Sequence, residues 1–175
     1  RTMEESLLKA MRSLETGVCH IYHKKFDDWT NDRLLEYIAE PTDDRLYAIA
    51  QLIRGGVDLV LIYNRTKIDM FFLEKFKNIV EFERVVEAAP MDIEVLREAK
   101  RMGFSDKFIG QLWGVSQHDM YLLREKNGIF PVYKMIDTCA SEFSSYVPYF
   151  YSTYEDENES LVSDKEKIVV LGSGP

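Results

Sequence analysis

The residues best suited to chemistry in this chain are its two cysteines and three histidines, three of which lie together in Cys19-His20-Ile21-Tyr22-His23. Thiolate and imidazole groups are the usual ligands of zinc, so the cluster raises the hypothesis of a metal site. A zinc site needs about four ligands, commonly as two pairs at fixed spacing, and the chain offers no second pair. Cys139 and His118 lie far away in the sequence. We therefore expect a loop with incidental residues and predict no metal ligand.

Cys139 and His118 are also the remaining candidates for catalysis. A catalytic cysteine needs a histidine base or surroundings that lower the pKa of its thiol, and nothing near it in the sequence supplies either. We predict a packing or turn role for Cys139. His118 lies where a helix is expected to begin, in Ser116-Gln117-His118-Asp119, and we interpret it as a surface residue near a helix cap. No catalytic residue is predicted.

The last residues form a third motif with chemical potential. The apolar run Lys167–Leu171 precedes Gly172-Ser173-Gly174-Pro175, which is the order of a short strand followed by a glycine turn. Such a turn binds phosphate when a helix follows, because the N–H groups of the helix N-terminus point at the anion. That helix is not among these residues, so we predict no cofactor-binding residue.

The composition predicts a folded chain with a water-exposed outside. Hydrophobic residues make up 46% of the sequence and charged residues 30%. No run of about 18 apolar residues occurs, so no membrane span is expected, and the first residues lack the apolar core of a signal peptide. Two cysteines do not make a disulfide framework, and we expect a reducing, cytoplasmic location.

The net charge of −8 is unevenly distributed. Six acids and one base lie between Glu155 and Glu166, so this segment carries a net charge of −5. Charge runs of this kind are usually solvated, and we interpret residues 155–166 as an acidic linker. The rest of the chain is close to neutral for its size.

Helical patterns dominate the chain up to Gly128. An amphipathic helix is predicted over Glu4–Leu14, ending at Gly17, and a second short helix begins after Thr30 or Asn31 and ends before Pro41. This second helix carries an apolar stripe formed by Leu34, Leu35 and Ile38.

Two central passages, Asp44–Phe82 and Ile93–Ile129, are interpreted as a diverged internal repeat. In each passage a helix ends in glycine, a capping residue starts a short apolar helix, and a turn leads to a longer helix; Asp69–Leu73 matches Asp119–Leu123. Glycine suits the left-handed backbone that follows a helix end. We predict two related helical units of helix-turn-helix type.

Beyond Gly128 the helical period is lost. Phe130–Tyr133 is predicted to be extended, because proline does not fit a helix interior. A group of aromatic residues follows: Tyr146, Tyr149, Phe150, Tyr151 and Tyr154. Such density is costly to leave in water, so these residues either fold back on the helical units or pack against a neighbouring domain. The predicted fold class is mainly α, with two related helical units, an extended C-terminal segment and one short terminal β-strand.

Several segments resemble the large subunit of carbamoyl-phosphate synthase around the junction of its two ATP-grasp synthetase halves. The resemblance is carried by Pro131–Phe143, Tyr151–Glu155 and the final strand with its glycine turn. It implies four parts. Residues 1–26 would be the last helix of the first half plus a variable loop, 27–154 the helical oligomerisation domain, 155–166 the acidic linker, and 167–175 the first strand and turn of the second half.

The resemblance also implies a function for the parent protein. The parent is a glutamine-dependent ligase that makes carbamoyl phosphate from bicarbonate, ammonia taken from glutamine and two ATP, for arginine and pyrimidine biosynthesis. It would use ATP with Mg or Mn at sites outside these residues, so this region would be a non-catalytic connecting and oligomerisation domain. The implied partners are other domains of the large subunit, the glutaminase small subunit and further copies of the chain. Our interface hypothesis is the stripe of Leu34, Leu35 and Ile38.

Two other functions stay open on the sequence alone. Phe108–Arg124 fits a helix-turn-helix, in which a nucleic-acid reader would place the second helix in the major groove. The charges between Asp106 and Lys126 cancel, so the basic phosphate contacts of such a module are missing, and we expect no nucleic-acid partner. A free-standing helical adaptor is the second alternative.

Overall fold

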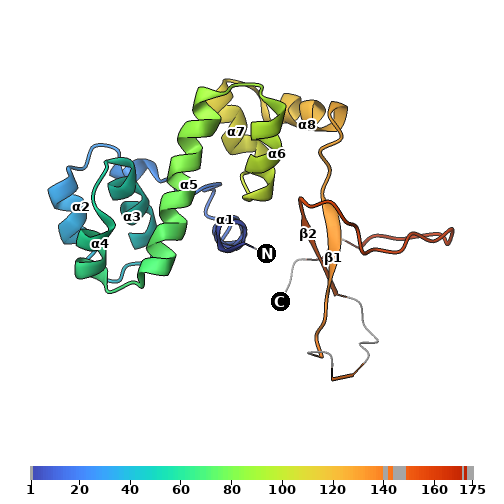
Figure 1. The fold of residues 1–175 in the computed structure, drawn as a ribbon, viewed down its shortest axis with the longest axis horizontal. Helices are drawn as coiled ribbons and strands as arrows, with labels where there is room; N and C mark the ends of the chain where they lie inside the picture. Colours follow the sequence, from blue (N-terminus) through green and yellow to red (C-terminus); the bar gives the residue numbers. More distant parts are fainter. Residues whose placement is uncertain (1, 140–141, 144–148, 171, 173–175) are drawn as a thin grey trace. The chain divides into compact units, whose positions relative to one another are not determined.

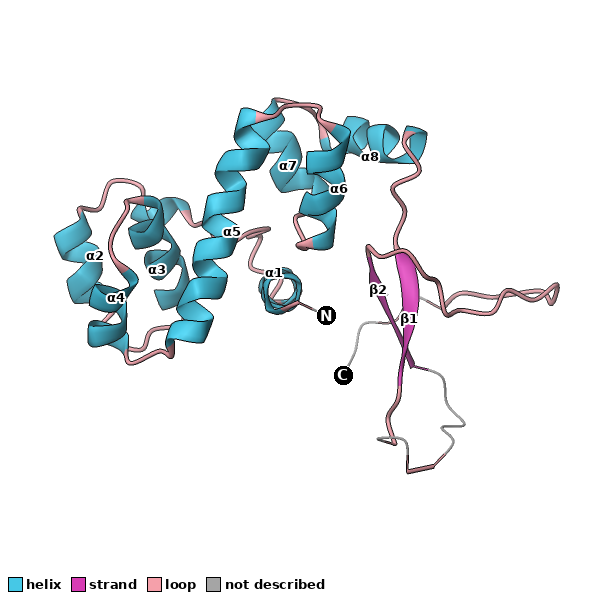
Figure 2. Cartoon of the chain, in the orientation of Figure 1, coloured by secondary structure: helices cyan, strands magenta, loops and turns pink. Residues whose placement is uncertain are grey.

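The computed structural model describes residues 2–139, 142–143, 149–170 and 172, and the chain divides into two compact units, Arg1–Phe130 and Pro131–Pro175 (Figure 1). The described residues are mainly helical with one small sheet, which confirms the predicted fold class (Figure 2). The helices of the first unit are α1 (Met3–Ser13), η1 (Lys24–Phe26, a 3-10 helix), α2 (Asn31–Tyr37), α3 (Arg45–Arg54), α4 (Leu59–Thr66), α5 (Met70–Ala88), α6 (Ile93–Arg101), α7 (Asp106–Trp113) and α8 (Gln117–Lys126).

Side-chain caps determine where most of these helices begin. Short polar side chains accept a backbone N–H bond from the first turn, which satisfies a donor that has no partner inside the helix. Thr30, one of the two residues at which this helix was expected to begin, caps α2, and Ser116 caps α8. The other side-chain caps of α-helices are Thr2, Asp58, Asp69, Asp92 and Ser105.

The internal repeat is present as α3–α4–α5 and α6–α7–α8. The first helix of each copy ends in the same way, with Gly56 at φ +77° and Gly103 at φ +89°. The next residue then donates to a carbonyl of the preceding helix, Val57 to Leu52 at 3.0 Å and Phe104 to Ala99 at 2.9 Å.

The structure shifts one part of the predicted repeat alignment. Asp69 and Ser116 are the N-caps of the third helices, so the residues that follow each of them correspond. The sequence match of Asp69–Leu73 with Asp119–Leu123 is therefore displaced by nearly one helical turn. The correct register pairs Leu73 with Met120, and both of these side chains are fully buried.

The longest helix, α5, holds the first unit together. It packs against α1, α3, α4, α6 and α7, and Figure 1 shows it in green between α2–α4 and α6–α7. Its buried positions, which include Leu73, Phe76, Ile79, Val80 and Val86, recur at helical spacing. Each repeat therefore buries its apolar faces against a helix that is shared between them.

The second unit contains a two-stranded antiparallel sheet of β1 (Val132–Ile136) and β2 (Tyr149–Thr153), in which Lys134 pairs with Tyr151. The extended backbone expected near Pro131 is thus a strand. The aromatic segment supplies its partner, although Tyr146 lies outside the described residues.

The acidic segment that we expected to be a solvated linker contributes to this sheet. Asn158 Oδ1 accepts from the Tyr133 N–H at 2.9 Å, and Glu159 Oε2 accepts from the Met135 N–H at 2.7 Å. The Glu159 N–H in turn donates to the Tyr133 carbonyl at 2.8 Å. The outer edge of β1 is therefore covered, which protects it from pairing with another chain.

The strand expected at Lys167–Leu171 is not formed in its described part, residues 167–170. Ile168, Val169 and Val170 are strongly exposed there. A strand needs the backbone of a neighbouring strand, and hydrophobicity alone does not supply one. Ser173–Pro175 lie outside the described residues.

The division between the two units falls after Phe130. Helix α1 lies in the same unit as the repeats, against α5. The domain boundaries that we expect after residues 26, 154 and 166 stay predictions.

Replacing the two helix-ending glycines tests how closely α1 fits the repeats. Alanine at Gly56 has open space and should lower the free energy of unfolding by about 1–2 kcal/mol, the cost of a left-handed backbone. Alanine at Gly103 would place its Cβ 2.9 Å from Glu5 Cα. This overpacking should increase the loss of stability at Gly103 by about 1–3 kcal/mol beyond the cost of the left-handed backbone. Urea unfolding followed by circular dichroism measures both values. Equal losses would contradict the close contact of α1.

Candidate functional site

The cluster Cys19–His23 does not form a metal centre in the structure. Within the described residues, no group of three or more His, Cys, Asp or Glu side chains is arranged to hold a metal ion. Cys19 is a half-buried free thiol. Our interpretation of the segment as a loop with incidental residues is wrong for His20, which is only 1% exposed.

His20 belongs to a buried network that joins the loop to both repeats. Its Nε2 lies 2.9 Å from Glu83 Oε1 in α5, and Glu83 accepts two bonds from Arg54 at the end of α3, at 2.7 and 2.8 Å. The imidazole ring stacks on Phe108 of α7 with a centroid distance of 3.7 Å. Arg54 also donates to the Ile21 carbonyl at 2.9 Å, which fixes the loop at a second point.

Burial and hydrogen bonding determine the charges in this network. Burial lowers the pKa of His20, and the nearby Glu83 carboxylate only partly opposes this effect. Burial would raise the pKa of Glu83, but hydrogen bonds from Arg54 and His20 outweigh it and lower that pKa. At neutral pH Glu83 and Arg54 therefore form an ion pair. His20 is neutral and donates from Nε2 to the carboxylate.

A second buried network lies inside the second repeat. Asp106, at the start of α7, accepts from Lys100 Nζ at 2.8 Å and from Arg124 Nη2 at 2.7 Å. Arg124 also donates to the Ile129 carbonyl, and Lys100 donates to the Phe104 carbonyl. Burial lowers the pKa of Lys100 to about 8. The network joins α6, α7 and α8 around one carboxylate.

This network bears on the helix-turn-helix alternative. The predicted helices and turn are present as α7 and α8, joined at Gly114 in the left-handed conformation. The bases between residues 106 and 126 are Lys107, Arg124 and Lys126, and the side chain of Arg124 is buried against Asp106. An arginine held in this way cannot also contact a phosphate without breaking the network.

The other candidate residues have no catalytic surroundings in the described part of the chain. His118 is exposed in the first turn of α8, as expected. The Cys139 N–H donates to Asp137 Oδ1 at 3.0 Å, which supports the predicted turn role. None of the helices in the described residues is long and apolar enough to cross a membrane.

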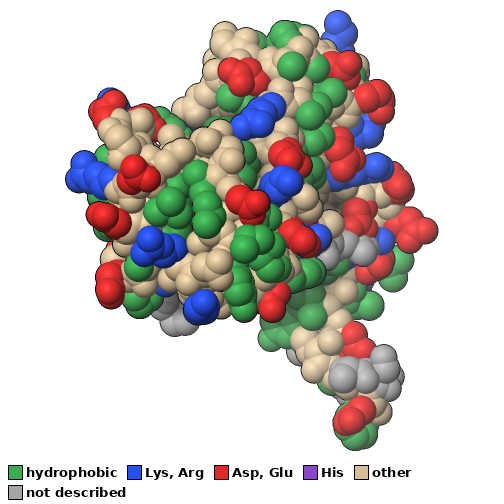
Figure 3. Space-filling view, turned by 60° about the vertical axis from the view of Figure 1, so that its left-hand side comes forward, with side chains coloured by type: hydrophobic (Ala, Val, Ile, Leu, Met, Phe, Trp, Pro, Cys, Tyr) green, Lys and Arg blue, Asp and Glu red, His purple; other side chains and the backbone are tan. Residues whose placement is uncertain are grey.

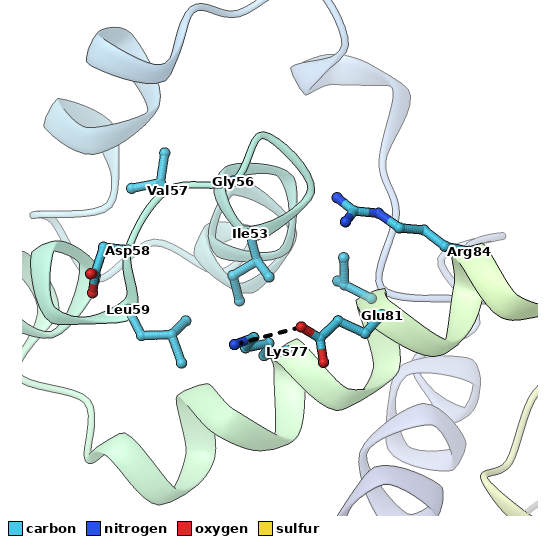
Figure 4. Close-up of a pocket in the computed structure, with 9 residues that line it drawn as sticks. Ile53, Gly56, Val57, Asp58, Leu59, Lys77, Glu81 and Arg84 are labelled. Atoms are coloured by element: carbon cyan, nitrogen blue, oxygen red, sulfur yellow. Dashed lines mark ion pairs between the residues drawn. The ribbon is translucent and has the colours of Figure 1, made fainter.

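A hollow of about 420 Å³ lies between the α3–α4 turn and α5, and Figure 4 shows its lining side chains. Its charged residues have structural partners. Asp58 accepts from the Val60 N–H at 2.7 Å, Lys77 lies 3.5 Å from Glu81, and Arg84 donates to the Arg54 carbonyl at 3.0 Å. The charged side chains of the hollow are therefore held by one ion pair and by two hydrogen bonds with the backbone.

Two residues of the proposed interface stripe are in the core. Leu34 is 1% exposed and Ile38 is fully buried, while Leu35 is half-buried. Helix α2 packs against α3 and α4, and this packing buries most of the stripe. Leu34 and Ile38 cannot meet another chain while the fold is intact, which corrects the hypothesis at these positions. A contact through Leu35 stays a prediction.

Exposed apolar side chains lie elsewhere in the first unit. Figure 3 shows hydrophobic side chains gathered between charged ones on one side of the molecule. One set is on α4 and the first turn of α5, and consists of Val60, Leu61, Tyr63, Phe71 and Phe72. Another is on and after α8, and consists of Tyr121, Leu122 and Phe130.

Neither of the two buried networks was predicted from the sequence. Glu83 is 63 residues from His20, and Asp106 is 18 residues from Arg124. A charged residue on the apolar face of a helix, such as Glu83 in α5, is the one local sign that could have prompted a search for a partner.

Comparison with known families gives a match over most of the chain. A family model described as "Carbamoyl-phosphate synthetase large chain, oligomerisation domain" matches residues 1–128. The match includes α1 and both helical repeats, and ends just after α8. The motifs in which the sequence resemblance is strongest lie at residues 131–175, outside the match, and the match over residues 1–128 confirms the resemblance.

Acid should weaken the fold through His20. Below a pH of about 6.5 the unfolded chain binds a proton on His20 that the folded chain resists, so the free energy of unfolding should fall as the pH falls. The added slope is at most about 1.4 kcal/mol per pH unit. The free energy of unfolding, measured with urea between pH 7.5 and 5, should depend less steeply on pH for His20→Gln than for the native chain. Identical slopes would contradict the buried neutral imidazole.

Removing the central carboxylate of the second network should be costly. Asp106→Asn leaves Lys100 and Arg124 buried without a counter-charge and should lower the free energy of unfolding by about 3–5 kcal/mol. The control is Glu125→Gln, an exposed acid on α8, which should change it by less than about 0.5 kcal/mol. The two variants are compared by urea unfolding, and similar losses would argue against the network.

Proposed function

Since the chain belongs to the family of carbamoyl-phosphate synthetase large chain oligomerisation domains, we propose that it connects parts of that large chain and associates with further copies of itself. The observation that carries this proposal is the family match over residues 1–128. The structure supports a non-catalytic role, because the buried His, Lys, Arg and acidic side chains described above are bound to one another in structural networks.

The parent reaction belongs to the same proposal. The parent ligase would make carbamoyl phosphate from bicarbonate, ammonia released from glutamine and two ATP, for arginine and pyrimidine biosynthesis in the cytoplasm. ATP and its Mg or Mn ion would bind in the synthetase halves rather than in this region. A glutaminase small subunit would supply the ammonia. This region would then hold the two halves of the large chain in a fixed arrangement.

The attachment of α1 supports a rigid connection. Asn78 of α5 donates to Glu4 Oε1 at 2.9 Å, and Arg12 donates to the Gly103 carbonyl at 2.8 Å. The two contacts fix α1 to the shared helix and to the turn between α6 and α7. If α1 is the last helix of the first synthetase half, this half is joined to the repeats without a flexible hinge at α1.

The proposal predicts that the 175-residue chain self-associates. Sedimentation equilibrium over a wide concentration range should give an average mass that rises above the monomer mass of 20.5 kDa. A parallel cell with duplex DNA should give no binding, because Arg124 of the helix-turn-helix is held by Asp106 and does not reach a phosphate. A monomer at every concentration would count against association through this region, and salt-sensitive DNA binding would favour the alternative function.

A further inference from the structure

The two copies of the internal repeat differ in how their short middle helix is covered. Helices α4 and α7 have the same length, begin at side-chain caps and end at left-handed residues, Lys67 and Gly114. The fourth residue of each, Ile62 and Ile109, is fully buried. The third residue differs, because Leu61 is 52% exposed and Phe108 only 8%.

The apolar face of α7 is covered by elements other than its neighbour α8. The ring of His20, in the loop after α1, stacks on Phe108. The indole N–H of Trp113 donates to the Val86 carbonyl of α5 at 2.6 Å, which fixes the end of α7. In the first repeat, α4 packs against α2 and α5, yet Val60, Leu61 and Tyr63 remain exposed. The same helix thus has its apolar face covered in one copy and open in the other.

Two phenylalanines at the start of α5 extend the exposed set. Phe71 and Phe72 are exposed and contact each other edge-on, with ring centroids 5.3 Å apart. Lys75 Nζ lies 5.3 Å from the Phe71 ring, which helps to order it. We name Val60, Leu61, Tyr63, Phe71 and Phe72 together the α4–α5 surface. Exposed apolar patches often mark surfaces that bind another protein.

We infer that the α4–α5 surface docks against the same surface of a second copy of this chain. The inference rests on the proposed function, because the family match describes an oligomerisation domain and so points to a copy of the chain as the occupant. Contact between identical surfaces closes on itself and does not propagate into filaments. It would give α4 the cover that the His20 loop gives to α7.

Charge also favours a second copy at this surface. The whole chain carries −8, which opposes contact between copies. Residues 59–75 contain three bases and two acids, a net charge of +1: Arg65, Lys67, Lys75, Asp69 and Glu74. A surface that meets itself needs both signs, because a single sign would repel. The α4–α5 surface therefore carries no net negative charge, and two copies can approach there without strong repulsion.

The size of the surface sets the expected strength. The five side chains of the α4–α5 surface are fewer than the roughly 20–30 residues per partner of a standard interface. Polar side chains around it must complete the contact. We therefore expect a concentration-dependent dimer rather than an obligate one.

The experiment compares two exposed leucines by sedimentation equilibrium of the 175-residue chain. Leu61→Glu places an acid within the α4–α5 surface and should raise the dimer dissociation constant by roughly tenfold or more. Leu122→Glu is the matched control, since Leu122 is 44% exposed on α8 and lies outside the surface. Val60→Lys is a second variant of opposite charge and should weaken the dimer in the same direction. Circular dichroism and the urea midpoint confirm that each variant is folded.

The outcomes separate this inference from the proposed function. A native dimer weakened by Leu61→Glu and Val60→Lys but not by Leu122→Glu is the expected result. A native dimer that both α4 variants leave unchanged, or that Leu122→Glu weakens equally, overturns the surface assignment and leaves the proposed function standing. A native chain that is monomeric throughout overturns the self-association proposal itself.

Discussion

The first unit depends on one buried carboxylate. Glu83 accepts hydrogen bonds from Arg54 at the end of α3 and from His20 in the loop after α1. Through the stacked ring of His20 the same network reaches Phe108 in the second repeat. A buried carboxylate is expensive unless it is paired, so these partners must be in place whenever the helices are packed. The constraint orients α3, α5 and α7 relative to one another more specifically than apolar contact alone, which tolerates small shifts.

The same pairing explains why the described residues of the first unit leave few buried ionisable groups for chemistry. In the described residues of the first unit, the histidine, lysine and arginine side chains that are buried are bound to Glu83, to Asp106 or to backbone carbonyls. What the surface of α4 and α5 offers is apolar area with mixed charge around it. A domain that connects and associates needs a rigid core and an exposed surface that can bind another chain. The paired buried charges and the exposed apolar side chains of the first unit fit that need.

The sequence could predict features that depend on near neighbours in the chain. Helix caps at Thr30 and Ser116, and the glycines that end α3 and α6, follow from local backbone chemistry. The repeat and the mainly helical class follow from apolar spacing. The sequence did not predict the correct alignment within the repeat, because it suggested a match between two identical residues, Asp69 and Asp119. Only the cap geometry shows that Ser116 is the counterpart of Asp69.

By itself the sequence determined the α-helical character of the first unit, the repetition of its helices and the family resemblance. The tertiary structure decided which apolar faces are used up and which remain open. Leu34 and Ile38 looked available because their helix stands before the repeats, but α3 and α4 cover them. His20 looked incidental because its partner Glu83 is 63 residues away. Burial and ion pairing are relations between distant segments, and the spacing of residues along one segment does not contain them.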